Sequence, residues 1–187
     1  MGLERLDRLE REFPITVQTK AFILRPDIGS GGIPHSLRSG ETPDGELAEP
    51  LRSHAKEAGL VMRRASKVSY TLPSLQATKY AAEKGAEIPF HRALYKAYWE
   101  EGLDLESRDV LMAKAKACGL DADELDARLN SDHYLAVVEQ EYQEALDLGI
   151  NGIPAFRMGP FLFTGAQPYE FFRQVAQRVL SRDTSER

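Results

Sequence analysis

The residues that decide the fold run from Asn151 to Pro168 and read NGIPAFRMGPFLFTGAQP. Apolar and polar side chains alternate in Ala155–Met158, and Phe161–Thr164 is a second short run rich in aromatic residues. A two-residue turn, Gly159-Pro160, separates them. Two short alternating runs joined by two residues predict an antiparallel β-hairpin. The hairpin is entered through a turn signal, Asn151–Pro154.

A helix is expected on each flank of the chain. After Pro168, at a plausible first helical position, apolar residues recur at helical spacing from Phe171 to Val179. At the other end, Leu3, Leu6, Leu9 and Phe13 recur every three or four positions, and Pro14 ends the stripe. Both segments therefore predict amphipathic helices.

Between Pro14 and the middle of the chain the pattern changes period. Ile15 to Leu24 begins with alternation and ends in a continuous apolar run, which predicts a strand that becomes buried on both faces. Residues 26–45 collect seven Gly or Pro turn signals and predict a long loop. The cluster of Arg63, Arg64 and Lys67 is interpreted as a solvent-exposed helix edge.

The stretch from Glu46 to Leu148 is rich in helix formers and nearly free of strand patterns. Five glycines fall just past periodic stretches, where helix C-caps favour glycine. Asp121, three residues before Glu124, resembles a capping box. The expected helices are 46–58, 73–84, 89–101, 107–118, 122–129 and 132–148.

The order helix, strand, helical block, hairpin, helix is the layout of an α/β domain interrupted by an all-helical insertion. We assign residues 1–45 to the first half of the α/β domain, 46–148 to the insertion, and 149–187 to the second half.

Composition excludes several classes of function. One Cys among 187 residues leaves no internal disulfide framework, no CxxC pair and no multi-Cys metal site. The four His are not at ligand spacing, so no metal is expected. A net charge of −5 gives no general attraction to nucleic acid or anionic lipid. The first 13 residues resemble neither a signal peptide nor a span, so the expected location is cytoplasmic and no membrane partner is expected.

Two residues were considered for chemistry. Cys118 ends an expected helix, where partial negative charge raises a thiol pKa, so a structural role is expected. Pro154 precedes a strand, a position where proline is tolerated, and on the residues alone the Ile153–Pro154 bond is expected to be trans.

The motifs at 151–156 and 161–168 together resemble the C-terminal half of a DsbA-like thioredoxin domain, closest to its FrnE-like branch. The helical block from Leu75 to Leu125 is similar to that branch as well. The resemblance covers nearly all of residues 2–180. It implies a thioredoxin-like fold with a helical insertion and thiol–disulfide oxidoreductase chemistry.

The resemblance also implies how such a site works. In the family a CxxC begins the first helix, whose dipole stabilises the attacking thiolate. The proline matching Pro154 is cis and faces the cysteine pair, and the residue before it offers backbone groups to an extended substrate. The expected substrate-binding residues are Gly152, Ile153 and Pro154, and the expected partner is an extended polypeptide or a thiol.

The sequence departs from the family where the chemistry would be. Both catalytic cysteines and the first, central strand of the sheet are missing, so no catalytic residue is assigned. Without that strand, residues 15–24 and 155–158 would each expose an unpaired edge, which suggests a homodimer through such edges. Two explanations account for this departure, a truncated product and a natural cysteine-free relative whose sheet another chain completes, and we favour the first.

Three functions follow from these observations. The leading one is a DsbA-family thiol–disulfide oxidoreductase that is inactive in dithiol exchange because the Cys pair is absent from this chain. The second is a glutathione-dependent kappa-type transferase or 2-hydroxychromene-2-carboxylate isomerase, which shares the fold and uses Ser. The third is a non-catalytic peptide-binding module. No cofactor is expected, except glutathione under the second.

Overall fold

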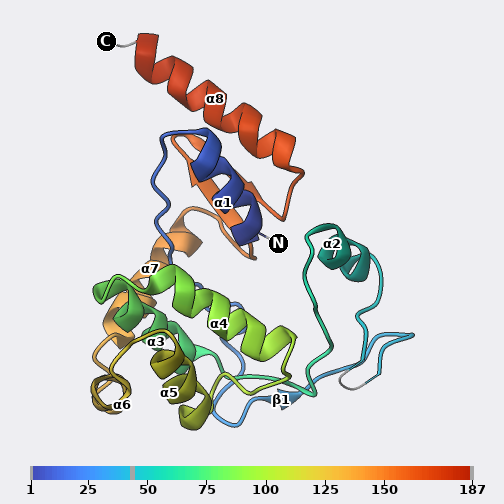
Figure 1. The fold of residues 1–187 in the computed structure, drawn as a ribbon, viewed down its shortest axis with the longest axis vertical. Helices are drawn as coiled ribbons and strands as arrows, with labels where there is room; N and C mark the ends of the chain where they lie inside the picture. Colours follow the sequence, from blue (N-terminus) through green and yellow to red (C-terminus); the bar gives the residue numbers. More distant parts are fainter. Residues whose placement is uncertain (1, 43–44, 186–187) are drawn as a thin grey trace. The chain divides into compact units, whose positions relative to one another are not determined.

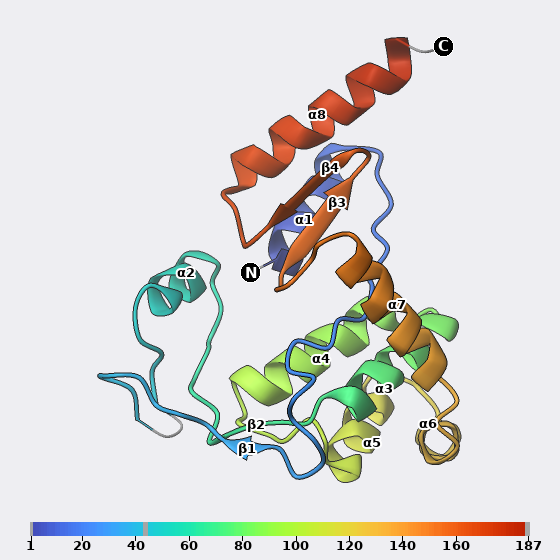
Figure 2. The ribbon, with the colours of Figure 1, turned by 180° about the vertical axis from the view of Figure 1, so that it is seen from behind.

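The structure is a computed structural model that describes residues 2–42 and 45–185. The chain divides into two compact units. One is built from the residues up to Lys20 together with those from Glu144 onward, and the other is the continuous stretch Ala21–Gln143. Figures 1 and 2 show the elements of each unit. We call them the discontinuous unit and the helical unit.

The discontinuous unit packs two helices against one hairpin. Helix α1 spans Gly2–Glu12 and helix α8 spans Tyr169–Ser185, while strands β3 (Ala155–Met158) and β4 (Phe161–Thr164) form the hairpin. Figure 2 shows the hairpin in front of α1. The register pairs Phe156 with Phe163 and Met158 with Phe161, as a two-residue turn requires. The predicted hairpin and both predicted helices are confirmed.

The core of this unit is small and aromatic. Leu9 and Phe172 are fully buried at its centre, and Ala176 is nearly so. Phe156 and Phe163 come from the hairpin, on the face turned toward the helices, and each ring meets that of Phe172 edge to face. The alternation in the sequence therefore places every second side chain of the hairpin on one face, where these side chains form a single apolar layer.

The strand predicted at Ile15 to Leu24 is wrong. Exposure alternates along this stretch up to Lys20, as it does along a strand, but no regular structure forms. A β-strand is defined by hydrogen bonds to a neighbour, and within the described residues β3 and β4 form a sheet of their own. The alternation therefore turns every second side chain of this segment inward, but the segment forms no β-ladder hydrogen bonds with a neighbouring strand of the described residues.

The helical unit is organised around helix α3 (Leu72–Glu83), which packs against α4 (Glu87–Trp99), α5 (Arg108–Ala117) and α6 (Ala122–Asn130). Tyr80 and Phe90 are fully buried among them. Helix α7 (Leu135–Asp147) continues out of this unit into the other, and the short helix α2 spans Leu51–Glu57. All six helices expected in the block are present, with ends within three residues of those expected, except that α2 begins at Leu51 rather than at Glu46.

Helix ends follow the sequence signals. The five glycines expected after helices all have positive φ: Gly59, Gly85, Gly102, Gly119 and Gly149. The Asp121 carboxylate caps α6 by accepting from the backbone N–H groups of Asp123 and Glu124, each at 3.0 Å. A capping box would also need the Glu124 side chain to accept from the backbone N–H of Asp121. In the structure the Glu124 carboxylate instead contacts Tyr80, Lys84 and Arg128.

The long segment before α3 holds more structure than expected. Strand β1 (Ile33–Pro34) pairs antiparallel with β2 (Lys67–Val68). Strand β1 lies inside the predicted loop, and β2 begins at Lys67, the last residue of the basic cluster. The interpretation of that cluster as a solvent-exposed helix edge is wrong. Arg64 is buried and its guanidinium pairs with the Glu41 carboxylate, which also accepts from two backbone N–H groups.

These pairings explain where the units divide. Our sequence boundary lay after residue 45, whereas in the structure residues 21–45 belong to the helical unit. They are attached to it at several points: β1 on β2, Glu41 on Arg64, and the Ala21 N–H on the Glu141 carboxylate at 2.6 Å. Glu141 also pairs with Lys79, an ion pair that is nearly buried.

Candidate functional site

Pro154, the last residue of the loop Gly152–Pro154, lies against the beginning of α1. A Cβ added at Gly2 would lie 3.2 Å from Cζ of Phe156 and 3.7 Å from Cβ of Pro154. The Ile153–Pro154 bond is cis, and the Pro154 carbonyl accepts from the Gly165 N–H at 2.7 Å. Pro154, one of the three residues assigned to substrate binding, is thus adjacent to the first turn of α1.

Ile153 is the exposed member of this loop. Half of its surface is accessible, although it is a large apolar residue, while Pro154 and Gly152 are half-buried. The first turn of a helix carries backbone N–H groups without intrahelical partners and a partial positive charge. Pro154 therefore follows an exposed apolar residue in the chain and packs beside a polar helix end.

The end of the hairpin is fixed to the same helix. Arg5 Nε donates to the carbonyl of Gln167 at 2.6 Å, and the Gln167 side chain donates to the carbonyl of Thr164 at 2.9 Å. Farther along α1, Glu12 accepts from Tyr169 and pairs with Arg173 on α8. These contacts hold α1 in register with the hairpin and with α8.

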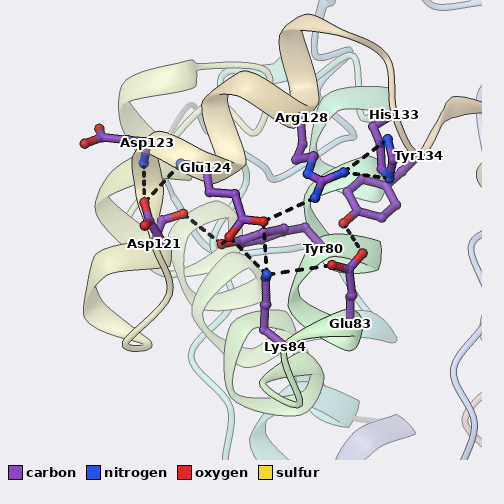
Figure 3. A network of polar contacts seen from close by, with 9 residues as sticks. All are labelled: Tyr80, Glu83, Lys84, Asp121, Asp123, Glu124, Arg128, His133 and Tyr134. Carbon is purple, nitrogen blue, oxygen red and sulfur yellow. Dashed lines mark hydrogen bonds and ion pairs between the residues drawn. The ribbon is translucent and has the colours of Figure 1, made fainter.

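A second polar cluster lies inside the helical unit (Figure 3). The Tyr80 hydroxyl lies 3.0 Å from the carbonyl oxygen of Asp121 and 3.1 Å from the carboxylate of Glu124, and Lys84 pairs with that carboxylate. Burial, followed by Glu124, raises the pKa of Tyr80 to about 12. Lys84 and the Tyr80 hydroxyl lower the pKa of Glu124.

The same cluster extends to the start of α7. Tyr134 donates to Glu83 at 2.6 Å, and Arg128 contacts both Glu124 and the His133 ring (Figure 3). Burial and Glu83 raise the pKa of Tyr134, while the hydrogen bond from Tyr134 lowers that of Glu83. Both tyrosines stay protonated and both carboxylates ionised at neutral pH, so the cluster joins helices rather than exchanging protons.

Cys118, the single thiol, borders a cavity of about 260 Å³ beside this cluster. Tyr80, Lys84 and Glu124 also line it. Cys118 is half-buried at the end of α5, and burial raises its thiol pKa, with Lys114 opposing the effect. The pKa shift has the predicted direction, but its main cause is desolvation rather than the helix end. The thiol is not prepared to react as a thiolate.

The family model for the DSBA-like thioredoxin domain matches residues 1–177. The chain belongs to this family. Its fold is accordingly thioredoxin-like, with the helical unit as the insertion. A search of curated proteins finds no match.

Solved structures share the fold at low sequence identity. A probable DsbA oxidoreductase from Streptomyces coelicolor is 22% identical with a TM-score of 0.75, over 96% of this chain and 83% of that one. A 2-hydroxychromene-2-carboxylate isomerase is 15% identical with a TM-score of 0.67, over 98% and 90%. A candidate protein disulfide isomerase from Nitrosomonas europaea is 19% identical with a TM-score of 0.70, over 97% and 91%.

The described residues contain no group of three or more His, Cys, Asp or Glu side chains placed to hold a metal ion. None of their helices is both long and apolar enough to cross a membrane.

The sequence located some of these residues and missed others. Gly152, Ile153 and Pro154 were named through the family resemblance, and the structure adds that Gly2 packs beside them. The cluster around Tyr80 was missed, because its members lie about 40 positions apart in the chain. The only local signal was Asp121, which its capping pattern singled out.

Proposed function

We propose that the Pro154 loop and the first turn of α1 bind an extended polypeptide, and that this chain does so without catalysing dithiol exchange. The observation that carries the proposal is the close approach of Gly2 to Pro154 of the loop and to Phe156 of β3. In a DsbA-type oxidoreductase the attacking cysteine begins the first helix, beside the loop that holds the substrate. Among Gly2–Glu12, the residues of that helix in this chain, none is a cysteine.

The chemistry of disulfide exchange supports the second half of the proposal. A thiolate attacks a substrate disulfide to form a mixed disulfide, and a second thiol resolves it. This chain carries one thiol, Cys118, which directly follows α5 in the helical unit, and its raised pKa disfavours attack. Substrate binding can therefore be separated from redox chemistry in this chain.

Binding is proposed to use backbone and apolar contacts together. The backbone of Ile153 would pair with an extended chain, as in strand addition, while its exposed side chain would cover an apolar residue of the substrate. The FrnE-like branch and a cytoplasmic location are parts of the same proposal. Fractionation of cells that express the chain tests the location.

The experiment measures binding and exchange side by side. Anisotropy of a labelled, reduced and unfolded polypeptide should rise with the chain present, and Ile153→Asp should weaken binding about tenfold, while Ile153→Val should retain it. Reduction of insulin by dithiothreitol should proceed at the rate without protein. Insulin reduction at a rate comparable to that of a CxxC relative, or equal binding by Ile153→Asp, would overturn the proposal.

A second candidate is a glutathione-dependent transferase or isomerase. The likeness to the 2-hydroxychromene-2-carboxylate isomerase, over 98% of this chain, motivates it. Calorimetric titration with glutathione separates the two proposals. Saturable glutathione binding that Ile153→Asp abolishes would favour the second, whereas binding of the polypeptide alone favours the first.

A further inference from the structure

The hairpin of the discontinuous unit has an outer edge on β4 whose backbone groups are not paired with another strand among the described residues. The bond from the Gly165 N–H to the Pro154 carbonyl fixes which residues of the two strands exchange hydrogen bonds. Because such pairs alternate along an antiparallel ladder, the N–H and C=O groups of Leu162 and Thr164 point away from β3. In the part of the chain that the structure describes, no strand pairs with this edge.

Apolar side chains remain exposed on both sides of this edge. Leu162 is 41% exposed on the face turned away from the helices. On the helix side, Phe171 is 40% exposed, and its ring meets that of Phe163 on β4 edge to face at 5.0 Å. The ring contacts of Phe156 on β3 are with Phe163 and Phe172, so Phe171 lies toward the β4 side. A strand added there would cover apolar surface on both faces.

The two edges of the hairpin differ in charge. Strand β4 reads Phe-Leu-Phe-Thr and carries no charged side chain, whereas β3 places Arg157 among its exposed positions. Charged side chains on an edge strand oppose pairing with another chain. The β4 edge is therefore the more accessible to a neighbouring strand.

The β4 edge is also complementary to itself. In an antiparallel pair related by a twofold axis, Leu162 of one copy would face Thr164 of the other, which uses all four outward groups of each copy. Phe163 would then face its own copy across the axis, and no charged side chains of β4 would meet. The Thr164 carbonyl already accepts from Gln167, and a carbonyl oxygen has a second lone pair for the new bond.

We propose that two copies of this chain associate through the β4 edges, so that two hairpins become one four-stranded sheet. The edges at residues 15–24 and 155–158, named from the sequence, are not the ones used. This proposal does not depend on the proposed function, since its contacts involve neither Ile153 nor the start of α1.

Sedimentation equilibrium of the full chain over a wide range of concentration tests the proposal. The wild-type chain should dimerise reversibly. Leu162→Pro removes an outward N–H that the hairpin does not use, and the dimer should be lost. Arg157→Pro is the matched control, because it removes the outward N–H of the cross-strand partner on the other edge, and dimerisation should be unchanged.

Phe171→Ser changes only a side chain on α8 and covers the case in which the proline variants fold poorly. It should raise the dimer Kd by about tenfold, with an unchanged circular dichroism spectrum. Monomeric wild-type chain at every concentration would overturn the proposal. So would loss of the dimer in Arg157→Pro alone, or an unchanged dimer in both Leu162→Pro and Phe171→Ser.

Discussion

Phe172→Ala tests how far the discontinuous unit depends on one aromatic side chain. Phe172 is fully buried, and its ring centroid lies 4.7 Å from that of Phe156 and 5.1 Å from that of Phe163. Removing a buried Phe side chain costs about 3–5 kcal/mol. Because each edge-to-face contact contributes about 0.5–1.5 kcal/mol, the upper half of that range is expected.

Unfolding in urea, followed with one probe for each unit, measures this loss. At a slope of about 2 kcal/mol/M, a loss of about 4 kcal/mol lowers the urea midpoint of the discontinuous unit by about 2 M. Hydrogen exchange of peptides covering residues 155–176 reports the discontinuous unit. The fluorescence of Trp99, the single Trp, reports the helical unit. Exchange should accelerate strongly, while the Trp99 midpoint should change little.

Phe90→Ala is the matched control, because Phe90 is equally buried in the core of the helical unit. It should lower the Trp99 midpoint and leave exchange at 155–176 nearly unchanged. A loss below about 1 kcal/mol for Phe172→Ala would refute the account of the small aromatic core. An equal shift of the Trp99 midpoint by Phe172→Ala would refute the division into two separately packed units.

Three further predictions concern single residues. Asp121→Ala should cost about 1 kcal/mol in urea unfolding followed by Trp99, because two N–H groups at the start of α6 lose their acceptor, and Asp121→Asn should recover most of it. Arg64 and the backbone N–H groups lower the pKa of Glu41 to about 2, so its stabilisation is complete above pH 4.5 and is lost as the pH falls toward 2. The stability difference between wild type and Glu41→Gln should therefore shrink in that window, and a constant difference would contradict the assignment. Cys118 should react with iodoacetamide more slowly than an unfolded-chain thiol at pH 8, and Lys114→Ala should slow it further.

Local patterns predicted local structure well. The hairpin and its turn fall on the predicted residues, because alternation and the Gly159-Pro160 pair act within ten positions. Gly159 has φ +54, and an added Cβ would lie 3.3 Å from Val179, so the turn favours glycine on two grounds. Helix ends were predicted for the same reason, since caps involve neighbouring residues.

Features that need a distant partner were not predictable from pattern. Ile15 to Leu24 has the alternation of a strand, but pairing depends on a neighbour that no residue in the segment specifies. Arg64 looked exposed because its charge was weighed without Glu41, which lies 23 positions away. In the candidate site, the substrate-binding role of Pro154 was inferred only through the family resemblance. The packing of Gly2 beside it depends on how the first and last parts of the chain meet.

The discontinuous unit joins segments that lie far apart in the sequence, and this separation affects how the chain folds while it is being synthesised. Residues 21–143 are contiguous, so the helical unit can fold once they have left the ribosome. Helix α1 is made before the helical unit, but Leu9 is covered by residues of α8, which are made after that unit. Its apolar stripe must therefore stay exposed, or be held by a chaperone, until α8 has been made. Substitutions that make α1 less apolar should raise soluble yield in the cell while lowering the stability of the finished protein.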